Sequence, residues 1–168
     1  MLSLTFDRRE KVVLRDKTFR WIITKHFTFP PAPDVESGDV LDGLINNWRY
    51  RDNYATAKSY EMDAVTIHGP FLVASISRDD FKPVDARSFL NVLDEFLALY
   101  DKFPSEAKQA EIDAMFQPLQ SVDNQFFQMT KPLDTDLHEW GWVLWEFREL
   151  VVIDFARGHL ALCVMAID

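Results

Sequence analysis

Three potential metal ligands are spaced two residues apart in the last third of the sequence. They are Asp134, Asp136 and His138, followed directly by Glu139. Alternate side chains of an extended segment share one face, and two carboxylates with an imidazole can hold a divalent cation. The same residues are ordinary components of a polar loop, and this second interpretation is favoured. The sequence therefore predicts no metal and no other cofactor, and these residues are kept only as an alternative ligand pocket.

Other recognisable catalytic and cofactor patterns are absent from the sequence. His138 and Glu139 begin the H-E-x-x-H pattern of zinc proteases, but Trp142 stands where the second histidine is required. Neither a G-x-G-x-x-G nor a G-x-x-x-x-G-K-[ST] loop occurs. Cys163 is the only cysteine, which excludes an internal disulfide and a cysteine-based zinc site within one chain. Because its neighbours are apolar, we expect its thiol to have a raised pKa and to behave as a small hydrophobe.

His26 is a candidate general base. It lies on the polar face of an alternating segment, beside Thr24, Thr28 and Arg20. An unperturbed imidazole has a pKa of about 6.5 and can accept a proton at neutral pH. No nucleophile is tied to His26 by spacing, so a solvated or hydrogen-bonded role is favoured, with a ligand pocket near His26 as the alternative.

An acidic and aromatic stretch follows a proline-rich segment at residues 30–33. Part of its charge suits the start of a helix, where the macrodipole favours carboxylates. The alternative is a negative surface for a basic partner, because aromatic rings flanked by carboxylates fit a cationic groove. The residues predicted for this surface are Asp34, Glu36, Asp39, Asp42, Trp48, Tyr50 and Tyr54.

Three tryptophans occur within six residues. Exposed indoles at Trp140, Trp142 and Trp145 would stack on a sugar or on a partner protein. Half-buried rings that anchor the edge of the core are more common, and this interpretation is favoured.

The clearest structural signal is the alternation of apolar and polar residues from Phe19 to Phe29, which predicts a strand with one apolar and one wet face. Residues 7–10 read as a polar turn before it. A strand pair is expected at residues 61–67 and 71–77. Residues 140–147 fit a helix or a strand equally well.

Helices are expected between these strands. Apolar spacing predicts a short helix after a cap at Ser37, a strongly amphipathic helix after a cap at Asp85 extending to residue 103, and a helix over residues 105–117. Strands follow at residues 150–155 and 160–167, joined by a turn with Gly158. The second of these is apolar at both parities, so we expect it to be central and covered on both faces.

These elements predict an α+β fold for one domain spanning residues 1–168. Its antiparallel sheet combines N-terminal and C-terminal strands, and two to three helices from the middle of the chain pack on it. The 168 residues are sufficient for a sizeable core, since 48% are hydrophobic.

The charge distribution bears on partners. The net charge is −9. Residues 1–29 hold seven Lys or Arg and three Asp or Glu, a net of +4, and the remaining residues hold eleven and twenty-four, a net of −13. An acidic surface repels phosphate backbones, so nucleic-acid binding is not expected. No signal peptide or membrane-spanning stretch is evident, so a soluble cytoplasmic protein without membrane contact is predicted.

Three hypotheses for the function follow. The leading one is a non-enzymatic protein-binding module, in one form an acidic immunity or antitoxin-type inhibitor of a basic protein. The alternative is a small-ligand-binding protein or metal-assisted enzyme with a pocket near His26 or near Asp134, Asp136 and His138. The third is a homo-oligomeric scaffold in which exposed tryptophans form the self-interface.

Overall fold

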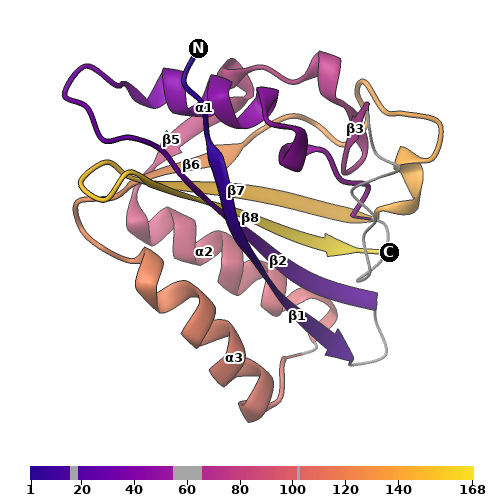
Figure 1. Ribbon diagram of the computed structural model, residues 1–168. Helices are drawn as coiled ribbons and strands as arrows, with labels where there is room; N and C mark the ends of the chain where they lie inside the picture. Colours follow the sequence, from indigo (N-terminus) through magenta and orange to yellow (C-terminus); the bar gives the residue numbers. More distant parts are fainter. Residues whose placement is uncertain (16–18, 55–65, 102) are drawn as a thin grey trace.

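One antiparallel sheet of six strands organises the protein (Figure 1). The computed structural model describes residues 1–15, 19–54, 66–101 and 103–168. The strand order is β1-β2-β8-β7-β6-β5. The strands are β1 (Thr5–Arg15), β2 (Phe19–Thr28), β5 (Phe81–Val84), β6 (Gln125–Met129), β7 (Glu146–Asp154) and β8 (His159–Ile167). A separate two-stranded hairpin joins β3 (Ile67–His68) to β4 (Phe71–Leu72). The predicted α+β class is confirmed.

Helices cover both faces of the sheet. In Figure 1, α1 (Ser37–Asn46) lies above the sheet, and α2 (Ala86–Leu97) and α3 (Glu106–Phe116) lie below it. No helix in the described part of the chain is long and apolar enough to cross a bilayer. We refer to the two sides of the sheet as the α1 face and the α3 face.

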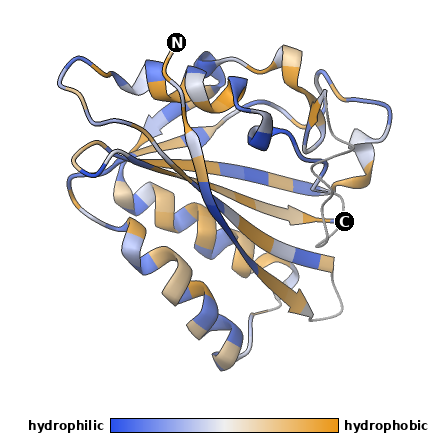
Figure 2. Ribbon diagram, in the orientation of Figure 1, coloured by the Kyte–Doolittle hydropathy of each residue, from blue (hydrophilic) through white to orange (hydrophobic). Residues whose placement is uncertain are grey.

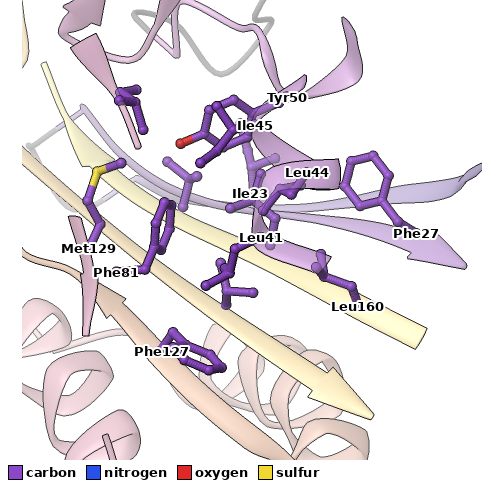
Figure 3. Packing of buried hydrophobic residues seen from close by; sticks show 14 of the residues in the cluster. Ile23, Phe27, Leu41, Leu44, Ile45, Tyr50, Phe81, Phe127, Met129 and Leu160 are labelled. Atoms are coloured by element: carbon purple, nitrogen blue, oxygen red, sulfur yellow. The ribbon is translucent and has the colours of Figure 1, made fainter. Parts of the chain in front are cut away.

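The strand at residues 160–167 occupies the position that its composition predicts. β8 pairs with β2 on one side and β7 on the other, and all of its residues except the first are buried. Even-numbered residues of β8 pack on the α1 face and odd-numbered ones on the α3 face. Figure 2 shows the resulting strand as hydrophobic along almost its whole length. Figure 3 shows the apolar cluster on the α1 face, with Ile23, Phe27 and Leu160 among its members.

The prediction of a wet face on the strand at residues 19–29 is wrong. Eight of the ten residues of β2 are buried, including Arg20, Thr24 and His26 on the α3 face. Alternation in one strand shows which side chains share a face, but it does not show what covers that face. Here α2 and α3 cover the polar side of β2, so its polar groups need partners inside the protein.

The helix caps predicted at Asp85 and Ser105 are confirmed. The cap of α1 and the end of α2 differ from the prediction. Asp85 Oδ1 accepts a hydrogen bond from Ser88 N at 2.7 Å, and Ser105 Oγ caps α3. The N-cap of α1 is Glu36 rather than Ser37. The helix expected to reach residue 103 ends at Leu97.

The remaining differences concern strands. The predicted turn at residues 7–10 is part of the continuous strand β1. Neither β5 nor β6 was predicted from the sequence. Of the expected strand pair at residues 61–67 and 71–77, residues 61–65 lie outside the described residues. Ile67–His68 and Phe71–Leu72 form the short β3–β4 hairpin, and the expected continuation of the second strand is wrong because Val73–Ser75 is a 3₁₀ turn. Residues 140–147 form a 3₁₀ turn at Gly141–Val143 that leads into β7.

A buried polar cluster lies on the α1 face. Its members are Lys25, Tyr50, Asp52, His68 and Glu149, all with side chains sealed from solvent. Lys25 Nζ lies 2.9 Å from Asp52 Oδ2 and donates to the carbonyl of Arg49 at 2.7 Å. Burying one such charge without its counterpart would be costly, so the pair holds β2 against the segment that follows α1.

Short hydrogen bonds join the second half of the cluster. Tyr50 OH donates to Glu149 Oε1 at 3.0 Å, and its ring stacks on His68 with centroids 3.7 Å apart. His68 Nδ1 donates to the carbonyl of Tyr50 at 2.6 Å, and its Nε2 lies 2.6 Å from Glu149 Oε2. Burial, followed by the nearby Glu149 carboxylate, raises the pKa of Tyr50 well above its usual value. The tyrosine therefore stays a hydrogen-bond donor.

The buried ion pair gives a first prediction. Lys25→Met removes the ammonium and leaves the Asp52 carboxylate buried, so the free energy of unfolding should fall by about 3–5 kcal/mol. Urea unfolding measures the change, with Lys82→Met on the exposed face of the edge strand β5 as the matched control. The double variant Lys25→Met/Asp52→Leu should recover part of the loss. Equal free energies of unfolding for Lys25→Met and Lys82→Met would contradict the assigned role of the pair.

Candidate functional site

A pocket of about 360 Å³ opens on the α3 face, where the polar side of β2 is not fully covered by helix. Its floor comes from β1, β2 and the β7–β8 turn, and the end of α3 and the residues after it form the opposite wall. The lining residues are Arg8, Glu10, His26, Thr28, Ala114, Met115, Pro118, Leu119, Asn124, Asp154, Arg157 and His159.

A bulge in β1 turns charged side chains toward this pocket. Phe6 pairs with Phe27, but the next pair is Arg8 with His26, so Asp7 is an extra residue in β1. An extra residue reverses the alternation of a strand. Phe6 therefore packs on the α1 face, while Arg8 and Glu10 share the α3 face with His26.

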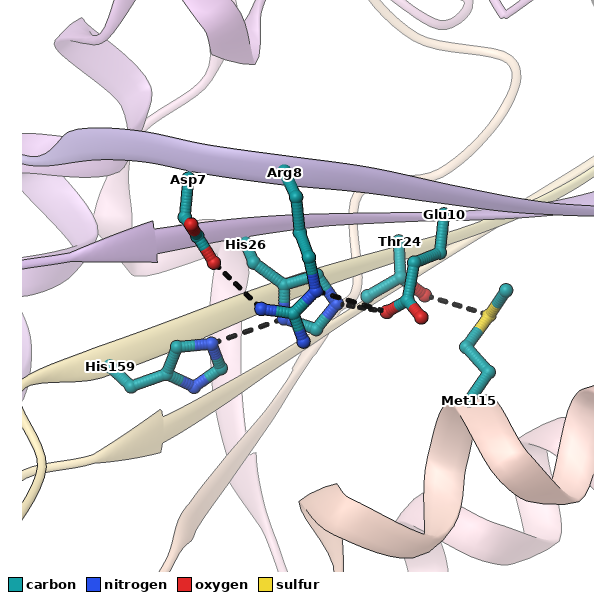
Figure 4. A network of polar contacts seen from close by, with 7 residues as sticks. All are labelled: Asp7, Arg8, Glu10, Thr24, His26, Met115 and His159. Atoms are coloured by element: carbon teal, nitrogen blue, oxygen red, sulfur yellow. Dashed lines mark hydrogen bonds and ion pairs between the residues drawn. The ribbon is translucent and has the colours of Figure 1, made fainter.

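Glu10, His26 and His159 form a hydrogen-bonded chain (Figure 4). His26 Nε2 lies 2.5 Å from Glu10 Oε2, and His26 Nδ1 lies 3.1 Å from His159 Nε2. The two imidazole rings are stacked with centroids 5.2 Å apart. The pairing of Thr28 with His159 places the second histidine beside the first, although 133 residues separate them in the sequence.

Both imidazoles are neutral at neutral pH, and this fixes the direction of the hydrogen bonds. Burial, and then the positive charge of Arg8, lowers the pKa of His26, and Glu10 offsets part of this effect. Burial, and then the neighbouring His26, lowers the pKa of His159. The Glu10 carboxylate accepts from His26 Nε2–H, so His26 Nδ1 accepts from His159 Nε2–H. In neutral His159 the remaining nitrogen, Nδ1, is then a hydrogen-bond acceptor.

The charged groups at the pocket mouth are paired with one another. Arg8 Nη1 donates to Asp7 at 2.6 Å, and its Nε lies 3.8 Å from Glu10. Arg157 Nε lies 3.7 Å from Asp154, whose Oδ1 also accepts from Arg157 N at 3.0 Å. These pairs are exposed and contribute little to stability. The pocket mouth therefore holds three carboxylates and two guanidinium groups, a formal excess of one negative charge.

The pocket predicted near His26 is present, but its two partners were not predicted. Glu10 was assigned to a turn, and His159 to a hairpin turn without ligand-like neighbours. A single sequence gives no signal for this grouping, because it depends on the pairing of β1 with β2 and of β2 with β8.

The alternative pocket at residues 134–138 is not formed as a ligand set. Asp136 Oδ2 pairs with Lys131 Nζ at 2.8 Å. His138 Nε2 donates to the carbonyl of Gly69 at 2.9 Å, and its Nδ1 accepts from Trp140 N at 3.2 Å. Both ring nitrogens are therefore engaged. Within the described ranges, no three His, Cys, Asp or Glu side chains are placed to hold a metal ion.

The four carboxylates of the acidic stretch lie at the surface, and two of them have partners within the protein. Asp34 and Glu36 are exposed, and Glu36 lines an open groove of about 880 Å³ with the proline-rich segment. Asp39 Oδ2 accepts from Glu36 N at 3.1 Å at the start of α1, and Asp42 pairs with Arg78 at 3.2 Å.

The three aromatic residues of the same stretch are divided between surface and interior. Trp48 is exposed, with the Arg49 guanidinium 3.9 Å from its ring centroid. Tyr50 and Tyr54 are fully buried, so they cannot present their rings to a partner in this conformation. Both pack around His68 instead.

The favoured interpretation of the tryptophans as half-buried core anchors is wrong. Trp140, Trp142 and Trp145 are all more than 60% exposed. Trp145 N donates to the carbonyl of Ile167 at 2.9 Å, so this ring lies beside the end of β8. Trp140 and Trp142 contact each other with centroids 6.5 Å apart, on the 3₁₀ turn that precedes Trp145.

One further exposed ring, that of Phe19, lies at the same end of the sheet. Phe19 O accepts from Asp168 N at 3.1 Å, on the side of β8 opposite Trp145. The neighbouring Arg20 donates to two carbonyls at the end of α2, at 3.1 and 3.2 Å, which brings the residues after α2 to this end (Figure 1). We define the aromatic end as Phe19, Trp140, Trp142 and Trp145, each between 61% and 75% exposed.

Comparisons with known proteins add no functional assignment. No protein-family model matches the sequence, and no curated protein matches it. Among solved structures, a crystal structure of citrus MAF1 is similar at 8% identity with a TM-score of 0.38, and the alignment covers 88% of this chain and 89% of that chain. A likeness this weak carries no argument about function.

The histidine pair gives a prediction about pH. The folded pKa values of His26 and His159 are lowered. Below the unfolded value of about 6.5, the unfolded chain therefore binds more protons, and the free energy of unfolding falls as the pH is lowered through this range. Urea unfolding at about pH 7.5 and about pH 5.5 should show this loss, and His159→Gln should make it smaller. The wild type and the His159→Gln variant carry the same surface carboxylates. If their free energies of unfolding depend on pH identically, the lowered pKa assigned to His159 is contradicted.

Proposed function

We propose that this protein is a non-enzymatic protein-binding module that engages a basic partner through the aromatic end. The observation that carries the proposal is a group of four large aromatic side chains, each more than half exposed, near the end of β8. Single exposed apolar residues are ordinary on protein surfaces, whereas clusters of them mark interaction sites. Tryptophan in particular is enriched among residues that dominate binding energy.

The charge around the aromatic end supports a basic partner. Exposed Glu139 precedes the first tryptophan, and exposed Asp168 follows β8. Glu95 and Glu146 share a single cation, Arg148, at 3.3 and 3.5 Å. The net charge of the whole protein is −9. Complementary charge of this kind speeds the encounter with a basic protein and suppresses binding to acidic ones.

The position of the aromatic end also suits an interface. Backbone hydrogen bonds to Phe19 and Trp145 tie two of its rings to the sheet. Aromatic side chains on a rigid support lose little conformational freedom on binding, because each has only two rotatable side-chain bonds.

The exposed part of the acidic stretch is a second surface for the same function. Asp34, Glu36 and Trp48 are exposed, and Glu36 lines the open groove. Asp39 and Asp42 already have partners within the protein, so their carboxylates are less able to pair with cations of a binding partner. An immunity or antitoxin-type inhibitor of a basic toxin is one concrete form of this proposal, and it would use either surface.

A tryptophan variant distinguishes the two surfaces. The protein is used to capture partners at low and high salt, and affinity for a stoichiometric basic partner is then measured by calorimetry. The triple variant Trp140→Ser/Trp142→Ser/Trp145→Ser should weaken that affinity at least about 30-fold, since truncating a dominant interface residue costs about 2 kcal/mol or more.

Matched controls come from the same chain. Trp48→Ser removes an exposed indole outside the aromatic end, and Val122→Ser removes an exposed apolar side chain from a loop; both should retain the partner. The variant with Asp34, Glu36, Asp39 and Asp42 changed to Ala tests the acidic stretch. Unchanged affinity of the triple variant contradicts the assignment of the aromatic end. Wild-type dimers that the triple variant abolishes would instead identify the partner as a second copy.

The alternative function is small-ligand binding at the pocket of Glu10, His26 and His159. The specific observation that favours it is a neutral imidazole with a free acceptor nitrogen beside a cavity of about 360 Å³. The same nitrogen could act as a general base in an enzyme, but the lining contains no serine, cysteine or lysine that would serve as a nucleophile.

A further inference from the structure

We infer that the pocket on the α3 face binds a small hydrogen-bond donor, a primary amine or amidine attached to an apolar group, through His159 Nδ1 and Asn124 Oδ1. The site differs from both protein-binding surfaces, so this inference does not rest on the proposed function. The geometry of the pocket supplies four arguments for this class of ligand.

The first argument is the direction of the Glu10–His26–His159 chain. Glu10 can only accept, so each imidazole donates toward it from Nε2. The two nitrogens of an imidazole point in opposite directions, and Nδ1 of His159 is therefore directed away from His26 (Figure 4). It meets no partner within the described part of the chain. A ligand that reaches it must donate a hydrogen bond.

The second argument is an acceptor left without a partner. Asn124 lines the same pocket, and its Nδ2 donates to the carbonyl of Leu119 at 3.0 Å. This bond fixes the orientation of the amide and leaves Oδ1 buried with no hydrogen bond. Buried polar atoms are almost always satisfied, so this oxygen is an acceptor for a donor that enters the cavity.

The third argument is electrostatic. The titratable and charged groups around the histidines are Asp7, Arg8 and Glu10 from β1, Asp154 from β7, Arg157 from the turn and Cys163 from β8. Burial raises the pKa of the Cys163 thiol to about 12, so it carries no charge. α3 contributes no titratable side chain to the lining.

The two cations of the pocket are already paired. Arg8 contacts Asp7 and Glu10, and Arg157 contacts Asp154. An anionic ligand would have to compete with these carboxylates, whereas a cationic donor would meet two unpartnered acceptors. The charge pattern therefore favours an amine over a carboxylate.

The fourth argument is the apolar wall. Ala114, Met115, Pro118 and Leu119 form the side of the pocket opposite the histidines. A cavity of about 360 Å³ lies at the small end of the range for ligand sites. A molecule with one ring and one amino group matches both its size and its division into a polar and an apolar side.

Two probes with the same ring and opposite polar groups test this inference. Benzylamine and benzoate are titrated into the full-length protein, and the ¹⁵N resonances of the His159 imidazole and the Asn124 side-chain amide are followed by NMR. Benzylamine should give saturable shifts at both residues. Benzoate should give none. Saturable binding of benzoate, or no saturable shift with benzylamine, overturns the inference.

The variant His159→Phe keeps a ring and removes the acceptor, so it should bind benzylamine at least about tenfold more weakly, which corresponds to about 1.4 kcal/mol. Asp34→Asn, on the exposed loop before α1, is the matched control and should bind as the wild type does. Amide spectra of both variants report whether the fold is retained.

The pH dependence of wild-type binding provides a readout that does not depend on any variant. Protonation converts His159 Nδ1 from an acceptor into a donor and adds a positive charge beside the ammonium. Benzylamine affinity should therefore fall as the pH is lowered from about 7.5 to about 5. An affinity that rises or stays constant over this range overturns the inference.

Discussion

The whole structure depends on the covering of β8 and its neighbours from both sides. β8 is hydrophobic at both parities and lies between β2 and β7, so it can be stable only if both faces of the sheet exclude water. α1 on one face and α2 with α3 on the other provide this cover. As a consequence, β2, which carries Arg20, Thr24, Lys25 and His26, is buried as well.

Buried polar side chains must then find partners, and the two faces solve this problem differently. On the α1 face, Lys25 pairs with Asp52, and His68 pairs with Glu149, in a region sealed from solvent. On the α3 face, His26 and the end of α3 line a pocket that packing leaves open. The first group is complete and serves to hold the fold together. The second ends in an unused acceptor, which is why it is a candidate for ligand binding.

Local features of the fold could be predicted from the sequence, and long-range ones could not. Asp85 and Ser105 mark helix starts because a cap depends on the next three residues only. The composition of β8 identified a central strand, because a strand that is buried on both faces has apolar residues at successive positions. In contrast, β5 is short, contains Pro83 and lies at the sheet edge, so it gives almost no periodic signal. Residues 7–10 are polar yet continue β1, in which the bulge at Asp7 turns Arg8 and Glu10 toward the α3 face.

The candidate sites show the same limit. His26 was identified from its place on a polar face, but Glu10 and His159 join it only through strand pairing. The exposure of Trp145 depends on its position just before β7 begins, and the burial of Tyr50 depends on Glu149, 99 residues away. Residue type alone suggested the opposite arrangement, with the tyrosines at the surface and the tryptophans in the core.

The ¹⁵N chemical shifts of the imidazole nitrogens of His26 and His159 at neutral pH test this account most directly, because they report which nitrogens carry protons. The hydrogen-bonded chain predicts that both rings are neutral, with protonated Nε2 and unprotonated Nδ1. A proton on His159 Nδ1 at neutral pH would contradict the account, because the pocket would then offer a donor where an acceptor is proposed.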